Sequence, residues 1–100
     1  MIIKILPNDR GDPPNKLADV ELLFEEGALS GLRLVGFAIW QSRTGNGRSV
    51  TLPAKAFIVR GERRAYALLR PLNDASSTDS LRRTILESYE EFEHRQAVAT

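Results

Sequence analysis

The residues most able to do chemistry are arginines in the middle of the chain. Residues 43–70 carry seven basic side chains and one carboxylate, Glu62, which gives this segment a net charge of +6. Six of the seven are arginines, whose planar guanidinium suits phosphates and base edges. The pattern predicts a nucleic-acid or polyanion surface. The alternative is a solvated sheet edge that its charge keeps from pairing with other sheets. The candidate binding residues in this segment are Arg60, Arg63, Arg64 and Arg70.

Arg82 and Arg83 form a second candidate site, at the start of a predicted helix that follows the Ser/Thr-rich residues 76–80. Free amide groups and a partial positive charge at a helix N-terminus favour a phosphate. The alternative is a ladder of ion pairs, because Asp79, Arg83 and Glu87 recur at every fourth position. Both hold together if Arg83 pairs within the helix and Arg82 stays free.

Aromatic residues lie among the central arginines. A platform for base stacking needs exposed rings between basic residues. Tyr66 lies between Arg64 and Arg70 on one strand face, which makes it the candidate for stacking. Trp40 and Phe57 lie in apolar runs, so we predict that both belong to the core.

Catalytic and metal-binding patterns are missing from the sequence. The chain has 100 residues, no cysteine and one histidine, His94. Without cysteine there is no disulfide scaffold, thiolate nucleophile or Cys-based zinc site. The glutamates between residues 87 and 93 are typical of a solvated helix face. We therefore expect no catalytic residue, no cofactor, no metal and no enzymatic activity.

Strands must position the central arginines. Alternation of apolar and polar residues is clearest at 17–24, and apolar or β-branched runs predict further strands at 2–6, 29–41, 48–52, 55–60 and 63–69. The segment Gly45-Asn46-Gly47 predicts one hairpin turn and Gly61 a second. Gly36 inside a strand predicts a bulge or a close backbone contact.

The last third of the chain changes to a helical period. Leu81, Ile85, Tyr89 and Phe92 recur at steps of three and four with Leu86 beside them, which predicts a helix over about 79–96. The length of 100 residues allows one domain, 1–100. We predict an α+β fold, an antiparallel β-meander of about five to six strands over about residues 2–70 with a C-terminal helix on one face.

No run of residues has the length of a membrane span, which needs about 18 uninterrupted apolar residues. The apolar start at residues 1–7 is too short for the core of a secretory signal. We therefore expect a cytoplasmic protein without a membrane partner.

The second half of the chain resembles the bacterial septation and sporulation regulators called SpoVG. The resemblance is carried by residues 48–55 (RSVTLPAK), the Gly-containing turn at 60–63, the segment 70–73 (RPLN) and the helix residues 85–89 (ILESY). It is densest over about residues 48–92, and the order and spacing of the motifs carry it more than any one of them.

The resemblance implies a small antiparallel sheet with a C-terminal helix, a homodimer built through the sheet and a nucleic-acid-binding regulator. In the family, basic residues at the helix start take part in binding. Here Thr78, Asp79 and Ser80 occupy those positions, and Arg82 and Arg83 follow about one turn later.

Residues and resemblance together predict a small homodimeric regulator that binds DNA or RNA largely through phosphate contacts. Arg82 and Arg83 would meet phosphates at the helix start, the four central arginines would extend the positive field, and Tyr66 would stack on a base. The alternative is a protein–protein interaction module without nucleic-acid binding.

Overall fold

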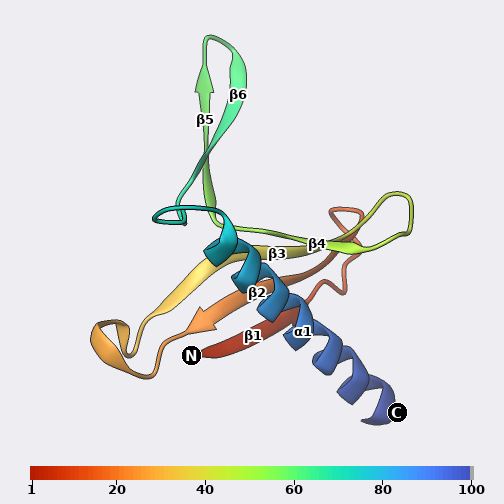
Figure 1. Ribbon diagram of the computed structural model, residues 1–100. Helices are drawn as coiled ribbons and strands as arrows, with labels where there is room; N and C mark the ends of the chain where they lie inside the picture. Colours follow the sequence, from red (N-terminus) through yellow and green to blue (C-terminus); the bar gives the residue numbers. More distant parts are fainter. Residues whose placement is uncertain (100) are drawn as a thin grey trace.

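The computed structural model describes residues 1–99 as two antiparallel sheets and one long helix (Figure 1). In chain order the elements are β1 (Ile2–Pro7), β2 (Lys16–Leu23), the short 3-10 turn η1 (Gly27–Leu29), β3 (Arg33–Gln41), β4 (Arg48–Thr51), β5 (Ala54–Val59), β6 (Glu62–Ala67) and α1 (Ser76–Ala99). One sheet has the order β1-β2-β3-β4, and β5 pairs with β6 alone. The predicted α+β class, with six strands and a C-terminal helix, is confirmed.

The strand predicted over 29–41 begins only at Arg33, because Gly27–Leu29 form η1, and both ends of the helix also differ from the predicted ones. The helix begins at Ser76 rather than near residue 79 and continues to Ala99 rather than to about 96. The strands between residues 2 and 67 form two sheets instead of one meander. The split comes at Pro53, which follows β4 and has no amide hydrogen to continue the ladder.

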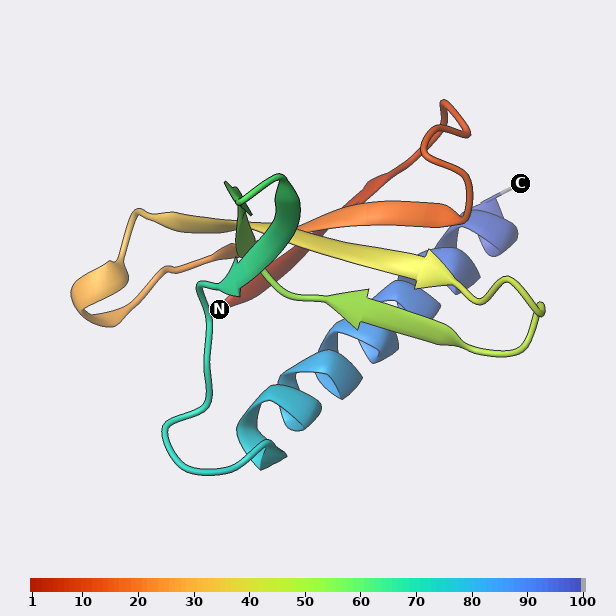
Figure 2. The ribbon, with the colours of Figure 1, turned by 90° about the horizontal axis from the view of Figure 1, so that it is seen from above.

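The core lies between the four-stranded sheet and α1. Ile85 and Tyr89 are the buried apolar residues of the helix, and they pack against apolar side chains that β2, β3 and β4 present on one sheet face. The sheet residues buried in this core are Ala18, Val20, Leu22, Phe37, Ile39 and Val50. The helix crosses that face diagonally, as Figures 1 and 2 show, so the predicted apolar stripe is the packed one. We call β1–β4 with α1 the sheet–helix body.

An ion pair joins the helix to the edge strand β4. The Arg48 guanidinium donates to both carboxylate oxygens of Glu93, at 2.5 and 2.9 Å, and lies 5.0 Å from the ring centroid of Tyr89. The hydrogen bond to Glu93 raises the pKa of Arg48, and burial raises the pKa of Tyr89. This bidentate geometry is the strong form of a carboxylate–guanidinium contact, so it holds the second half of α1 on the sheet.

The base of the β5–β6 hairpin lies against β3. Gly36 has φ of +106°, and a side chain there would place its Cβ 3.2 Å from the Cβ of Pro53. The register of β2 against β3 shifts beside Gly36, so the predicted bulge and close contact are both present. Beyond Pro53 every residue of β5 and β6 is exposed. The prediction that Phe57 belongs to the core is therefore wrong, because no second layer covers this hairpin.

Trp40, the other residue predicted for the core, lies outside the core cluster: it is half-buried on β3, where its indole N–H donates to the Thr51 hydroxyl at 3.0 Å. Among residues 1–99, no helix combines the length and the apolar character that crossing a membrane requires.

Candidate nucleic-acid interface

The β5–β6 hairpin carries four of the residues that the sequence predicts to bind nucleic acid. Arg63, Arg64 and Tyr66 lie on β6, and Arg60 forms the turn with Gly61. Arg60 and Gly61 have φ of 51° and 81°, as a two-residue turn with positive φ at both central positions requires. The hairpin projects away from the sheet–helix body in Figure 1 and is seen nearly end-on in Figure 2, so its side chains are open to a large partner.

The register of the hairpin sorts its side chains onto two faces, because directly opposite residues in an antiparallel pair share a face. The first face, which we call the ring-and-cation face, has the pairs Lys55–Tyr66, Phe57–Arg64 and Val59–Glu62. The second, which we call the alanine face, has the pairs Ala54–Ala67, Ala56–Ala65 and Ile58–Arg63. The two faces therefore differ in chemistry, since one mixes rings with charges and the other is small and apolar.

Arg70 joins the ring-and-cation face from the segment that follows β6. Its guanidinium carbon lies 3.9 Å from the ring centroid of Tyr66, and its Nε–H donates to the Ala67 carbonyl at 3.0 Å. Arg64 lies 3.2 Å from a carboxylate oxygen of Glu62, with both side chains exposed. An exposed pair of this kind is weak, so Arg64 remains accessible to a stronger anion.

Ion pairing of the basic side chains differs between the hairpin and the body. In the body, Arg48, Arg33 and Lys16 pair with Glu93, Glu21 and Asp19 at 2.5, 2.9 and 2.6 Å. On the hairpin, Lys55, Arg60 and Arg63 make no ion pair with any residue between 1 and 99. Residues 54–70 contain five basic side chains and one carboxylate, a net charge of +4. Lys4, Arg10, Arg43 and Arg83 of the body also make no ion pair within residues 1–99, but the chain outside 54–70 has a net charge of −3, so the net positive charge is concentrated where the chain projects.

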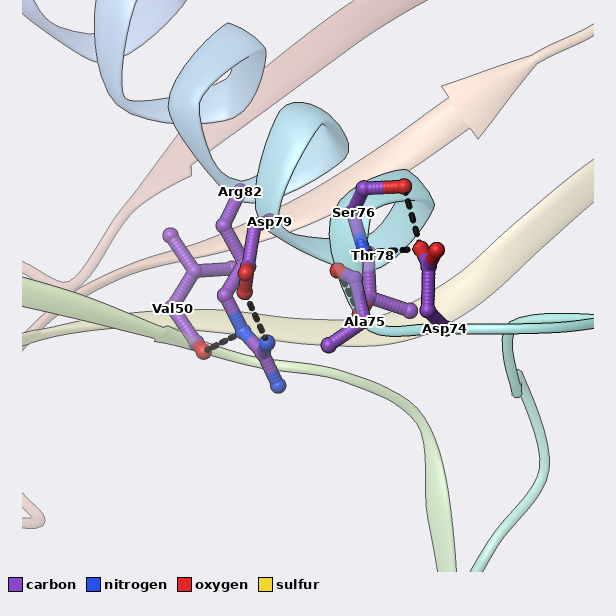
Figure 3. Close-up of polar contacts among 7 residues, drawn as sticks. All are labelled: Val50, Asp74, Ala75, Ser76, Thr78, Asp79 and Arg82. Atoms are coloured by element: carbon purple, nitrogen blue, oxygen red, sulfur yellow. Dashed lines mark hydrogen bonds and ion pairs between the residues drawn. The ribbon is translucent and has the colours of Figure 1, made fainter.

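The carboxylate of Asp74 lies at the N-terminus of α1 and binds its first residue. Asp74 accepts hydrogen bonds from the amide and the hydroxyl of Ser76, and these bonds lower the pKa of Asp74 (Figure 3). The Thr78 hydroxyl donates to the Ala75 carbonyl at 3.0 Å. An incoming phosphate at this helix end would meet a negative charge that already uses the amide of Ser76.

Arg82, and not Arg83, is the arginine that pairs with Asp79, although the spacing of four residues suggested Arg83. Arg82 donates to the Val50 carbonyl at 3.3 Å and lies 3.4 Å from Asp79, so it is the half-buried and paired one (Figure 3). Arg83 is exposed and makes no ion pair within residues 1–99. The alternative of an ion-pair ladder through Asp79, Arg83 and Glu87 is therefore wrong, and so is the combination in which Arg83 pairs within the helix and Arg82 stays free. The reason is the helical phase, since Arg82 lies three residues before the buried Ile85 and shares its face.

The structure brings together some of the predicted residues and separates others. Arg64, Tyr66 and Arg70 share the ring-and-cation face, whereas Arg63 lies on the alanine face and Arg60 at the turn. Arg82 and Arg83 belong to α1, which the segment 68–75 connects to the hairpin (Figure 2).

Two residues of the ring-and-cation face, Lys55 and Phe57, were not among the predicted site residues. Pairing the strands on either side of the Arg60-Gly61 turn would have placed Phe57 opposite Arg64 and Lys55 opposite Tyr66.

Comparisons with known proteins add no family to this geometry, because no family model, no curated protein and no solved structure matches the chain. Over residues 1–99, no three His, Asp or Glu side chains gather as the ligands of a metal would. The basic hairpin is thus the feature of the described chain on which a functional proposal rests.

Proposed function

We propose that this chain is a small homodimeric regulator, similar to SpoVG, that binds nucleic acid largely through phosphate contacts. One observation carries the proposal: residues 54–70 have a net charge of +4, and the hairpin that they contain stands clear of the body with all residues of both strands exposed. Stability does not explain that arrangement, because a lone two-stranded hairpin is marginal in water. Phosphate oxygens are the anions that arginine forks bind best.

The six candidate arginines contribute unequally to this binding. Arg60, Arg63 and Arg64 near the hairpin turn are the leading phosphate contacts, because the first two have no carboxylate partner and the third has an exposed one. Arg83 extends the field from α1, while Arg82 and Arg70 are held by contacts within the chain. Contacts of this kind fix position on the backbone and do not read sequence.

The second copy of the homodimer is proposed to cover the alanine face. Four alanines and Ile58 make that face flat and apolar apart from Arg63 near the turn, and Ile58 is 75% exposed in the single chain. Packing one alanine face on another would bury the alanines and Ile58 and give each hairpin the second layer that it lacks, while the long Arg63 side chain next to the turn keeps its guanidinium at the rim, within reach of a phosphate. The two ring-and-cation faces would then point outward.

The cellular setting follows the same resemblance. We place the regulator in the cytoplasm, which agrees with a sequence that has no cysteine, and in the control of septation or sporulation. Its proposed role is binding rather than catalysis.

The proposal is tested by titrating a fluorescently labelled nucleic acid with the intact protein at several salt concentrations. Binding should weaken steeply with salt, with a slope near −0.9 per phosphate neutralised on duplex DNA and about −0.7 on a single strand. Replacing Arg60, Arg63 and Arg64 together with Ala should remove close to three such contacts from the slope. A matched triple variant of exposed arginines on the body, Arg10, Arg33 and Arg43, should change it little.

Absence of binding to both single and double strands at low salt would refute the proposal. The protein–protein interaction module is then the remaining candidate, and one feature of the body favours it. A hollow of about 480 Å³ lies beside the open edge of β1, with Ile3, Ile5 and Phe92 among the residues that line it. Capture of a protein partner there should depend on salt less steeply than phosphate binding, because apolar residues make up half of its lining beside the polar Ser88, Glu91, Arg95 and Gln96.

A further inference from the structure

The ring-and-cation face has a regular arrangement that phosphate binding alone does not require. Its first two cross-strand pairs, Lys55–Tyr66 and Phe57–Arg64, each combine one ring with one cation. The ring lies on β6 in the first pair and on β5 in the second, so the two rings are diagonal neighbours. Diagonal positions on one sheet face are about 7–8 Å apart. Both rings are therefore within reach of neighbouring nucleotides of one strand.

Both rings are accessible to a flat ligand. Tyr66 is 51% exposed and Phe57 is 38% exposed, although Phe is among the residues most often buried. The hairpin is a single layer, so no other strand or helix covers them, and the Arg70 guanidinium lies over one face of Tyr66 only. A partner with its own π surface would remove this apolar area from water and gain stacking as well.

The charges beside the rings fit an anionic strand. Arg70 stacks on Tyr66 at 3.9 Å, and its bond to the Ala67 carbonyl holds the guanidinium in place. Lys55, Arg64 and Arg70 give this face three cations against the single carboxylate of Glu62. Guanidinium planes, like aromatic rings, also stack on nucleobases. The face therefore offers stacking surfaces and phosphate partners side by side.

From this arrangement we infer that the ring-and-cation face binds single-stranded nucleic acid by stacking bases on Phe57 and Tyr66, an inference that rests on the proposed nucleic-acid binding. In a duplex the bases stack on one another and show only their edges in the grooves. A single strand exposes the faces of its bases, and proteins that bind such strands combine a positive track with aromatic platforms. Lys55, Arg64 and Arg70 form the track here, and the two rings form the platform.

The test compares labelled oligothymidylate with a blunt duplex of the same length, each titrated with the intact protein by fluorescence anisotropy. The single strand is expected to bind more tightly at equal salt. Replacing Phe57 and Tyr66 together with Leu keeps the charge and the apolar character but removes the π surface. Stacking is worth about 1–3 kcal/mol per base, which corresponds to a loss of about fivefold or more in single-strand affinity for each ring. Duplex affinity and the salt slope should stay within about twofold of their starting values.

The matched control replaces Leu29 and Leu32, two exposed apolar residues on the body, with Ala. It should leave both affinities unchanged. The variant with leucine in place of Phe57 and Tyr66 should have the same circular dichroism spectrum and urea midpoint as the starting protein, because neither ring belongs to the core.

Each other outcome overturns the inference in a recognisable way. Equal affinity for duplex and single strand, together with an unchanged affinity of the ring variant, leaves phosphate binding intact and removes the stacking platform. A ring variant that becomes monomeric in light scattering would show that a second copy covers this face. Failure of both nucleic acids to bind at low salt would instead refute the proposed function itself.

Discussion

The sheet–helix body and the β5–β6 hairpin are built from similar residues that are used in opposite ways. In the body, apolar side chains of β2, β3 and β4 are buried under Ile85 and Tyr89, and the cation of Arg48 is paired with Glu93. In the hairpin, Ile58 is 75% exposed and Arg60 and Arg63 are unpaired among residues 1–99. Both regions alternate apolar and charged residues along their strands.

The difference between the regions comes from the second layer. The single helix is long enough to cover β1–β4, and it leaves the hairpin as one layer in water (Figure 1). Burial and ion pairing therefore stabilise the body, while the same residue types on the hairpin contribute little to the stability of the single chain. Surface that stability does not use is available for binding, and the comparison can be tested region by region.

The largest expected difference is between two isoleucines. Replacing Ile85, which is fully buried, with Ala should lower the free energy of unfolding by about 2–5 kcal/mol, because it removes apolar contacts and leaves a cavity. Replacing Ile58 with Ala should change it by less than about 0.5 kcal/mol in dilute protein, where the hairpin of each chain stands in solvent. Urea unfolding monitored by circular dichroism measures both.

A large loss for the Ile58 variant in dilute protein would break the comparison for the single chain, and the proposed second copy would then be the expected cause of the burial. Repeating the measurement over a range of protein concentrations identifies a second copy as the cause. A dimer that buries Ile58 makes the loss grow with concentration, because only the associated state contains the contact.

A smaller difference is expected between two arginines. Replacing Arg48 with Ala should cost about 1–2 kcal/mol, because Glu93 loses a bidentate partner and Tyr89 loses the stem and guanidinium that lie over its ring. Replacing Arg64 with Ala should cost less than about 0.5 kcal/mol, because its pair with Glu62 is exposed. Urea midpoints at low ionic strength give both values.

Replacing Arg48 with Lys is the control for geometry, because an ammonium keeps the charge but cannot match the fork of the carboxylate. It should restore only part of the lost stability. Equal losses for the Ala variants at Arg48 and Arg64 would contradict the claim that pairing in the body and pairing on the hairpin differ.

Most of the fold could be predicted from the sequence because periodicity identifies which residues share a face. The stripe through Ile85 and Tyr89 predicted the packed side of the helix, and alternation around Val20 predicted a strand with one buried face. Periodicity does not show whether another layer covers a face. Phe57 has the alternation of a core residue, and only the break at Pro53 separates its strand from the covered sheet.

The candidate site was less predictable, for two physical reasons. Cross-strand contacts such as Phe57 with Arg64 depend on register, and register depends on the exact turn residues, Arg60 and Gly61. At the helix start, Asp79 has a basic residue at both the third and the fourth position after it. Burial of Ile85 sets the rotation of the helix about its axis. That rotation determines that Arg82, and not Arg83, pairs with Asp79.

The smallest effect appears only in alkaline solution, and it tests whether the phenol of Tyr89 is buried in the body. Burial is the main cause that raises the pKa of Tyr89 above its ordinary value of 10.0; Glu93 raises it further, and Arg48 lowers it. Below that value the phenol is protonated in both states, so the stability is fully present. As the pH rises further, the unfolded chain ionises first, and stability is lost up to the higher folded pKa. The loss is about 1.4 kcal/mol for each unit that separates the two pKa values.

A Tyr89→Phe variant keeps the ring and should match the starting protein at neutral pH, yet lose less stability above pH 10 in urea unfolding. Parallel curves for the two proteins across the alkaline range would mean that water reaches the Tyr89 hydroxyl as freely as it reaches the hairpin.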